Sequence, residues 1–417
     1  MTWKKIAATI ALASASFTVS THANALEYKA DETEYPVIFA HGLFGWDSLA
    51  GYNYFGEDLW GTFIGDACSF MELNGCNDWI AHGQQTNDKA ERFQVSSMRN
   101  SEHRGAELFD HVQSFLATTG YTKVNLVGHS QGGYDIRKAA HLLKASALNG
   151  VPAGEIKVGA MISISTPHRG TGYAQSIYDQ WARNEENLFC GILPPLPDGK
   201  DACWSFARVL ADNLFDFLNG PEIEGNSLVD AGMQLIYDDY EPDDGIITGM
   251  KAFNQNYPSE GVAGYVGSIV TGQDNLKLSP LMAGLGIFLT YNADGDGYCV
   301  DDCDGDGAAG QGDGTTFDMD DDGLVPINSQ QMGYRLQYNP DDCAGLFCVF
   351  GNPLDTITEV ASTGYVADLN NPSAIQMTSH EGRLNQDHMD VISIGPDDLD
   401  EEEFYAAIFD FIESKGY

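Results

Sequence analysis

The 417-residue chain is strongly acidic, with 61 aspartates and glutamates against 21 lysines and arginines and a formal net charge of −40. A surface of this sign repels polyanions, so the composition argues against nucleic acid and against an anionic membrane as the main partner. The length suits one large α/β domain or two modest ones. No stretch beyond residue 25 is long and apolar enough to span a bilayer, which argues against stable membrane insertion.

The first 25 residues have the pattern of a secretory signal peptide. Lysines at positions 4 and 5 precede an apolar run over 6–19, and Ala-Asn-Ala at 23–25 fits cleavage between small residues. A membrane anchor is the alternative, but the apolar run is short and contains Ser and Thr. We therefore expect cleavage after Ala25 and export of the mature chain.

The eight cysteines fall into four close pairs, which suits an oxidising compartment. The pairs are Cys68 with Cys76, Cys190 with Cys203, Cys299 with Cys303, and Cys343 with Cys348. Local pairing is the simplest connectivity, although the sequence does not fix it. No Cys-x-x-Cys occurs, so a zinc or redox interpretation has little support.

Residues 35–40 (YPVIFA) have the composition of a buried strand and run directly into His-Gly-Leu-Phe-Gly at 41–45. A strand followed by His-Gly-x-x-Gly typically forms the first half of an oxyanion hole in α/β-hydrolases, with the backbone N–H of Leu43 as the candidate donor. An ordinary glycine turn is the alternative. We favour the oxyanion turn because it and the serine turn described next would both lie at the carboxyl ends of parallel strands.

The strongest local motif is Gly-His-Ser-Gln-Gly at 128–132. An apolar strand precedes it and a helical stretch over 134–147 follows it, as in a nucleophile elbow. The helix N-terminus behind Ser130 offers backbone N–H groups and a positive dipole end to a developing oxyanion. Glycines at 128 and 132 leave the room that this tight turn needs. Ser130 is therefore the predicted nucleophile.

Periodicity and composition predict the other elements. Residues 52–100 have the composition of loops and short helices, 101–118 of an amphipathic helix, 158–164 and 262–270 of buried strands, and 399–414 of a closing amphipathic helix. His168, in the turn after the strand at 158–164, is a conceivable catalytic base. We expect it to be structural, because the base of an α/β-hydrolase comes near the end of the chain.

Residues 173–220 differ in character from their surroundings. A Pro-rich loop between Cys190 and Cys203 is followed by apolar residues at roughly helical spacing from Trp204 to Leu218. A core helix is one interpretation. We favour a helical lid that covers the site in water and opens at a lipid surface, because of its place in the chain.

Residues 292–322 form a tract rich in aspartate and glycine. Its first seven residues match the opening of an EF-hand-type calcium loop, in which Asp294 and Asp296 occupy the third and fifth positions. Position twelve is Cys303 instead of glutamate, so the motif is incomplete. A calcium loop and a solvated acidic linker both remain open.

A serine nucleophile needs a base and an orienting carboxylate, which α/β-hydrolases supply in the chain order Ser, Asp, His. Only His380 and His388 lie in the C-terminal part of the chain. We predict His388 as the base and Asp322 as the carboxylate. Asp322 sits among other aspartates, but the apolar pair at 324–325 follows it and sets it apart.

In these motifs the chain resembles the secreted bacterial triacylglycerol lipases of the pseudomonad type, in the α/β-hydrolase superfamily. The shared stretches run in family order over 35–43, 123–133, 166–170, 253–258, 322–325 and 388–390. The resemblance implies an α/β-hydrolase fold: a mostly parallel central sheet flanked by helices, with a helical lid and here an Asp/Gly-rich insertion at about 292–321. It also implies carboxylester hydrolysis at an oil–water interface, oxyanion donors from Leu43 and Gln131, and a triad of Ser130, Asp322 and His388.

The same resemblance implies a calcium ion near the catalytic histidine, and no organic cofactor. Asp390 matches one aspartate of the family's site, Ile394 stands where the family has glutamine, and Asp274 is the nearest candidate for the other aspartate. The family's long-range disulfide has no counterpart here. With the pair Asp294 and Asp296, these residues predict structural calcium. Dependence on a dedicated folding chaperone stays open.

Three functions follow from the sequence, with residues 26–417 forming one lipase domain. The leading hypothesis is a secreted triacylglycerol lipase. The alternative within the hydrolases is an esterase, phospholipase or polyester depolymerase, because one triad serves all of them. From another class, a non-catalytic calcium-binding extracellular protein is disfavoured, because it would not need an elbow, an oxyanion turn and an ordered Asp and His together.

Overall fold

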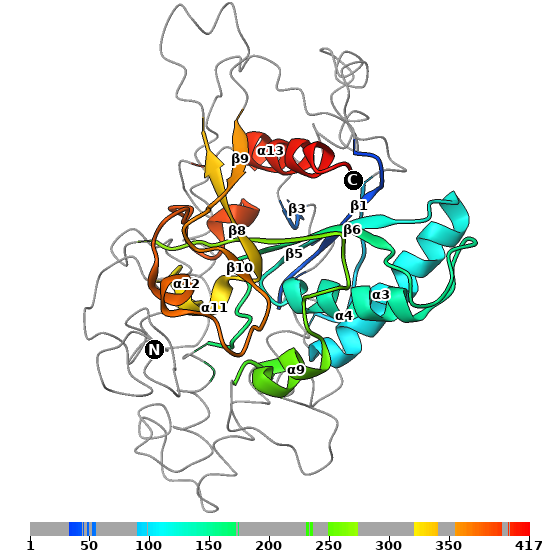
Figure 1. The fold of residues 1–417 in the computed structure, drawn as a ribbon, viewed down its shortest axis with the longest axis horizontal. Helices are drawn as coiled ribbons and strands as arrows, with labels where there is room; N and C mark the ends of the chain where they lie inside the picture. The colour runs from blue at the N-terminus through cyan, green and yellow to red at the C-terminus, as the bar shows by residue number, and fades with distance from the viewer. Residues whose placement is uncertain are drawn as a thin grey trace, which may run out of the picture.

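The computed structural model describes residues 33–43, 45, 48–49, 52–55, 90–97, 99–171, 174, 231–232, 234–236, 249–273, 321–340, 355–393, 399 and 401–417. The predicted signal peptide, all eight cysteines, the Asp/Gly tract before residue 321 and nearly all of the predicted lid lie outside these residues. Figure 1 shows the described elements in colour.

A mostly parallel sheet forms the centre of the molecule (Figure 1). Its strand order is β10-β8-β7-β6-β5-β1-β4, with β9 pairing to β8, and only β9 and β10 are antiparallel to their neighbour. The strands are β1 (Val37–Ala40), β4 (Ala90–Arg92), β5 (Val124–His129), β6 (Val158–Ile164), β7 (Tyr265–Ile269), β8 (Gly333–Asn339), β9 (Thr356–Glu359) and β10 (Tyr365–Val366). A separate hairpin joins β2 (Ser48–Leu49) and β3 (Tyr52–Asn53).

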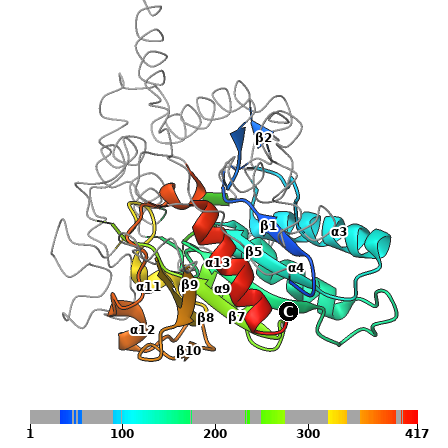
Figure 2. The ribbon, with the colours of Figure 1, turned by 90° about the horizontal axis from the view of Figure 1, so that it is seen from above.

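Helices lie on both faces of the sheet, as Figure 1 shows from the side and Figure 2 from above. They are α3 (Ser101–Thr119), α4 (Gly132–Ala145), α9 (Met250–Asn256), α11 (Ile327–Gln330), α12 (Ala374–Thr378), the 3-10 helix η4 (Asp390–Ile392) and α13 (Glu401–Ser414). Asn100 caps the N-terminus of α3 with a side chain that accepts from the N–H of His103, and Gly120 caps its C-terminus in the left-handed conformation. α3 and α4 pack together beneath one face, while α13 lies across the other.

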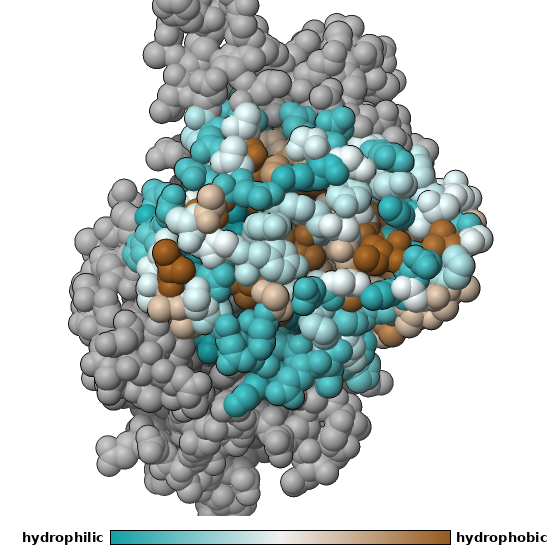
Figure 3. All heavy atoms as spheres, viewed as in Figure 1, coloured by the Kyte–Doolittle hydropathy of each residue, from teal (hydrophilic) through white to brown (hydrophobic). Residues whose placement is uncertain are grey.

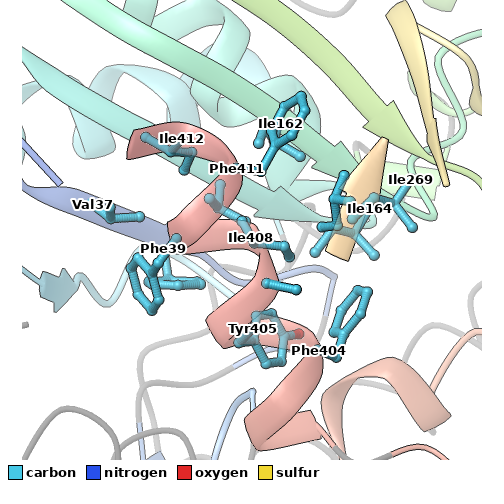
Figure 4. Close-up of a cluster of buried hydrophobic side chains, with 14 of the residues drawn as sticks. Val37, Phe39, Ile162, Ile164, Ile269, Phe404, Tyr405, Ile408, Phe411 and Ile412 are labelled. Carbon is cyan, nitrogen blue, oxygen red and sulfur yellow. The ribbon is translucent and has the colours of Figure 1, made fainter. Parts of the chain in front are cut away.

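Strands β1, β5, β6 and β7 are buried along their whole length, as expected for parallel strands covered on both faces. On the α13 side, apolar side chains of the helix pack against side chains of β1, β6 and β7 (Figure 4). The residues that Figure 4 labels are Val37, Phe39, Ile162, Ile164, Ile269, Phe404, Tyr405, Ile408, Phe411 and Ile412. A second core cluster fills the space between the sheet, α3 and α4.

The predicted α/β-hydrolase architecture is confirmed by this strand order and by the position of α4 directly after β5. One part of the prediction was wrong: residues 52–100 contain strands as well as loops, because β3 and β4 fall there. β4 pairs with β1 at the edge of the sheet over only three residues, too few to show a period in the sequence. The helix expected at 134–147 begins and ends two residues earlier.

The described surface is predominantly hydrophilic on the face seen in Figure 3, with scattered hydrophobic side chains. Among the described residues, Ile375 on α12 is a large hydrophobic side chain that is exposed, with half of its surface accessible. Within the described part of the chain, no helix combines the length and apolar character that crossing a membrane requires.

Candidate active site

Ser130 lies on the tight turn between β5 and α4. Its φ of 53° is in the left-handed region, which non-glycine residues seldom adopt, and its N–H donates to the carbonyl of Ile164 at 2.9 Å. The flanking glycines are sterically required: a Cβ on Gly128 would lie 2.4 Å from the carbonyl oxygen of Gly132, and one on Gly132 would lie 2.1 Å from that of Ala40. The turn is therefore a nucleophile elbow, strained as the motif demands.

The structure brings the three predicted triad residues into one hydrogen-bond path. His388 Nε2 lies 2.9 Å from Ser130 Oγ, and His388 Nδ1 lies 2.9 Å from Asp322 Oδ2. Both His388 and Asp322 are buried, whereas Ser130 retains 9% of its accessible surface. Because a carboxylate only accepts, Nδ1 of a neutral His388 carries the proton and Nε2 is free to accept one from the serine.

The Asp322 carboxylate is held by donors on both of its oxygens. Oδ1 accepts from the N–H groups of Leu324 and Val325 at 3.1 and 2.8 Å, and Oδ2 accepts from the hydroxyl of Thr271 at 2.8 Å. The backbone carbonyl of Asp322 also accepts the N–H of His388 at 2.8 Å. These bonds fix the carboxylate against the imidazole, so the ring has one orientation toward Ser130.

The predicted oxyanion turn lies against the serine. A Cβ on Gly42 would stand 2.8 Å from Ser130 Cβ, so only glycine permits this approach. The N–H of Gly45 donates to the carbonyl of Gly42 at 3.1 Å and closes the turn. Leu43 follows Gly42 in this turn and Gln131 precedes the first residue of α4, so both predicted donors belong to segments adjoining Ser130.

With this geometry in place, three comparisons with known proteins are informative. Residues 82–186 match the model of the family described as "Putative serine esterase (DUF676)". A triacylglycerol lipase of Vibrio cholerae is 34% identical over 192 residues, which cover 46% of this chain and 54% of the relative. A triacylglycerol lipase of Burkholderia plantarii is 34% identical over 147 residues, which cover 35% and 33%. The chain is similar to triacylglycerol lipases.

The matched region spans about half the length of the Vibrio relative. Among solved structures, lipase 1 from Pelosinus fermentans aligns with 17% identity and a TM-score of 0.44 over 91% of this chain and 98% of that one. EstA from Clostridium botulinum aligns with 16% identity and a TM-score of 0.41 over 93% and 89%. At these values the likeness says nothing about substrate, and the strand order and elbow carry the fold assignment.

Sequence reasoning missed the residues that support the triad from other elements. Thr271 follows β7 and Gln330 ends α11; the Gln330 side chain accepts from the Thr271 N–H at 2.8 Å and donates to the Thr271 carbonyl at 2.9 Å. Ser165 Oγ lies 2.7 Å from the Thr271 hydroxyl. The position of Thr271 at the carboxyl end of a parallel strand is the one signal that could have singled it out.

A buried ion pair supports the oxyanion turn. Arg104 of α3 lies 2.7 Å from Asp135 of α4 and donates to the carbonyl of His41 at 2.6 Å. Burial, together with the nearby Arg104 guanidinium, lowers the pKa of His41 to about 3, so this imidazole stays neutral. The pair therefore ties the turn to two helices, and losing one partner would leave a buried charge.

The side chain of His168 hydrogen-bonds Ser163, which is not a member of the triad. Its Nε2 is 2.9 Å from the hydroxyl of Ser163, and burial lowers the pKa of its fully buried imidazole well below the ordinary value. It bonds the strand that precedes its own turn, in keeping with a structural role.

Of the predicted calcium ligands, only Asp390 lies among the described residues. Asp390 begins η4, is buried, and accepts the N–H of Asp387 at 2.9 Å through Oδ2. Asp274, Asp294 and Asp296 lie outside the described residues. Within the residues that are described, no three side chains of the His, Cys, Asp or Glu type gather as a metal site would require.

Proposed function

We propose that the protein is a secreted serine carboxylester hydrolase, a triacylglycerol lipase of the pseudomonad type, acting through an acyl-enzyme. The observation that carries this proposal is the continuous path from Asp322 through His388 to Ser130, each step 2.9 Å, at a glycine-flanked elbow beside the oxyanion turn. The sequence similarity to triacylglycerol lipases supports the substrate class.

In the proposed mechanism, Ser130 Oγ attacks the ester carbonyl carbon while its proton passes to His388 Nε2. Negative charge develops on the carbonyl oxygen, where the N–H groups of Leu43 and Gln131 and the N-terminus of α4 would stabilise it. His388 then gives the proton to the departing alcohol, and the acyl group remains on Ser130. A water molecule, activated by the same imidazole, releases the fatty acid and restores the serine. Asp322 keeps the ring oriented throughout and stabilises its charged form.

We further propose that residues 173–220 form the lid and that the substrate is an acylglycerol at an oil–water interface. The basis is the apolar stripe from Trp204 to Leu218, which falls in the sequence between the elbow and the later triad residues. Export after Ala25 and four local disulfides belong to the same proposal. N-terminal sequencing of exported protein and mass spectrometry of non-reduced digests test them, and a bridge between distant pairs would contradict local pairing.

Structural calcium, bound through Asp294, Asp296 and Asp390, is proposed on the charge pattern of the sequence. The described residues alone do not complete such a site, so no catalytic step is assigned to the metal. Its expected effect is on folding stability.

The decisive experiment measures hydrolysis of p-nitrophenyl esters of rising acyl length beside emulsified triolein, with Ser130→Ala as the matched inactive variant. A triacylglycerol lipase should act on triolein and on long acyl chains. Activity confined to short dissolved esters would identify an esterase instead. Activity that survives in Ser130→Ala would refute the proposed nucleophile.

A further inference from the structure

A second hydrogen-bond chain runs beside the triad and joins the oxyanion turn to the main chain of the catalytic histidine. The N–H of Gly42 lies 3.0 Å from the hydroxyl oxygen of Tyr54, which lies 2.7 Å from His129 Nδ1. His129 Nε2 in turn lies 2.9 Å from the carbonyl oxygen of His388. Tyr54 is 3% exposed and His129 is fully buried, so bulk water does not compete for these bonds.

The two ends of this chain fix the position of every proton in it. The carbonyl of His388 can only accept, so His129 Nε2 must carry a hydrogen. Burial lowers the pKa of His129 well below its ordinary value, and the ring is neutral. Its Nδ1 is then a bare acceptor for the hydroxyl of Tyr54, whose oxygen accepts the N–H of Gly42. The tautomer of His129 is therefore determined by the structure.

Two different elements bring these groups together. His129 is the last residue of β5 and immediately precedes Ser130, and its ring centroid lies 4.9 Å from that of His388. Tyr54 follows β3, and its neighbour Phe55 packs edge-on against Phe39 of β1 at 5.2 Å. The chain thus spans from the first strand of the fold to the loop that carries the catalytic base.

This arrangement anchors His388 through both of its peptide groups. Its N–H donates to the carbonyl of Asp322 at 2.8 Å, and its carbonyl accepts from His129 at 2.9 Å. The imidazole can keep Nε2 at 2.9 Å from Ser130 only while this backbone stays in place. A displacement of about 1 Å at such a centre can reduce turnover by about a hundredfold.

We propose that His129 and Tyr54 are positioning residues for ester hydrolysis: His129 holds the main chain of His388, and Tyr54 donates to His129 Nδ1 and ties that ring to the oxyanion turn. The proposal rests on the hydrolase function proposed above. Neither residue touches the reacting atoms in this scheme, and both act through the placement of His388 and Gly42.

Substitutions at His129 distinguish the hydrogen bond to the His388 carbonyl from a purely steric role of the side chain. Glutamine places an amide N–H near the position of Nε2 and can still reach the His388 carbonyl. Asparagine reaches only the position of Nδ1, and phenylalanine keeps the ring without either nitrogen. We expect His129→Gln to stay within about tenfold of wild-type kcat, and His129→Asn and His129→Phe to lose about a hundredfold, with KM nearly unchanged in all three.

Tyr54→Phe removes one hydroxyl and should lower kcat by about tenfold, because His129 Nδ1 loses its donor, the Gly42 N–H loses its acceptor, and the ring is no longer tied to the oxyanion turn. His141 supplies the matched control: its Nε2 contacts the carbonyl of Pro258 at 2.7 Å, on the part of α4 remote from the elbow. His141→Phe should leave kcat and KM as in wild type. Circular dichroism and a fluorophosphonate titration of reactive serine show that each variant is folded and give the active-site concentration. Equal kcat in the glutamine, asparagine and phenylalanine variants would overturn the proposal.

A second measurement does not depend on activity. Nitrogen-15 NMR of histidine-labelled wild-type protein near neutral pH should show His129 as a neutral ring protonated at Nε2, with the signal assigned by its loss in His129→Gln. A ring protonated at Nδ1 would also overturn the proposal. If wild-type protein hydrolyses no ester at all, the proposed function fails, while the NMR result still decides whether the hydrogen-bond chain exists.

Discussion

The substitution Asp322→Asn offers the sharpest test of the triad, because the structure fixes how an asparagine must sit. The Oδ1 position faces two backbone donors, the N–H groups of Leu324 and Val325 at 3.1 and 2.8 Å. An amide nitrogen there would leave buried donors unpaired, at about 1–3 kcal/mol each. The NH2 group must therefore occupy the Oδ2 position, which faces His388 Nδ1 and the hydroxyl of Thr271.

In that orientation the asparagine donates to His388 Nδ1, so the ring proton moves to Nε2. Nε2 can then no longer accept the proton of Ser130. A preference of about 2 kcal/mol for this amide orientation leaves roughly 3% of molecules with the oxygen facing His388. Even these molecules lack the negative charge of the carboxylate. We expect kcat to fall about ten-thousandfold. Stability should fall by only about 1–2 kcal/mol, since the Oδ1 bonds survive and the Thr271 hydroxyl can rotate to accept.

The assay is p-nitrophenyl ester hydrolysis per fluorophosphonate-reactive site, together with denaturant unfolding. Asp355→Asn is the matched control, because Asp355 is also a buried aspartate that accepts a side-chain hydrogen bond, from Tyr338, but lies outside the triad. It should keep wild-type kcat. The reasoning is refuted if Asp322→Asn retains kcat within tenfold of wild type, or if Asp355→Asn loses as much.

Four further predictions can be tested with the same material. Ser130→Ala and His388→Ala should each lose more kcat than Asp322→Asn, that is more than about ten-thousandfold, while His380→Ala stays active; the reverse pattern for the two histidines would show that the base is misassigned. Joint replacement of Phe215 and Phe217 by Ser should reduce activity on emulsions more than on dissolved esters, and equal losses would indicate a core helix. Chelation should lower the melting temperature, with calcium restoring it better than magnesium; calorimetry that detects no binding would make the Asp/Gly tract a solvated loop. Burial lowers the pKa of three histidines in the folded state. Below about pH 6.5 these side chains stay neutral in the folded protein, whereas the unfolded chain binds protons at them. These residues are His41, His129 and His168. The free energy of unfolding should therefore fall as the pH drops from about 6.5 to 5, by up to about 1.4 kcal/mol per histidine per pH unit, and should not carry this penalty above about pH 6.5. A free energy of unfolding that stays constant between about pH 6.5 and 5 would contradict this prediction.

Local chemistry explains what could be read from the sequence. The elbow at Ser130 needs a strand, a glycine-flanked turn and a helix in immediate succession, so all of its determinants lie within about twenty residues of chain. The determinants of the turn at Gly42 are likewise local in sequence. Uninterrupted apolar runs predict the buried strands. The order of triad residues along the chain limited the base to His380 and His388, of which His388 was predicted.

The partners of these residues are set by packing between elements far apart in sequence. Thr271 meets Asp322 across 51 positions, Arg104 meets His41 across 63, and His129 meets His388 across 259. No periodicity or spacing in the sequence predicts such contacts, because each depends on the relative positions of strands and helices in the folded protein.

The neighbouring aspartates at 321 and 322 show the same division. Both precede Gly323 in one acidic run, and in the sequence only the apolar pair at 324–325 favoured Asp322 over its neighbour. In the fold, Asp321 accepts the N–H of Gly323, whereas Asp322 faces the imidazole of His388. The sequence by itself determined that a serine hydrolase elbow is present and which residue types complete it. Only the tertiary structure decided which further side chains hold that set in register, because hydrogen-bond geometry at a buried site depends on the relative placement of whole elements.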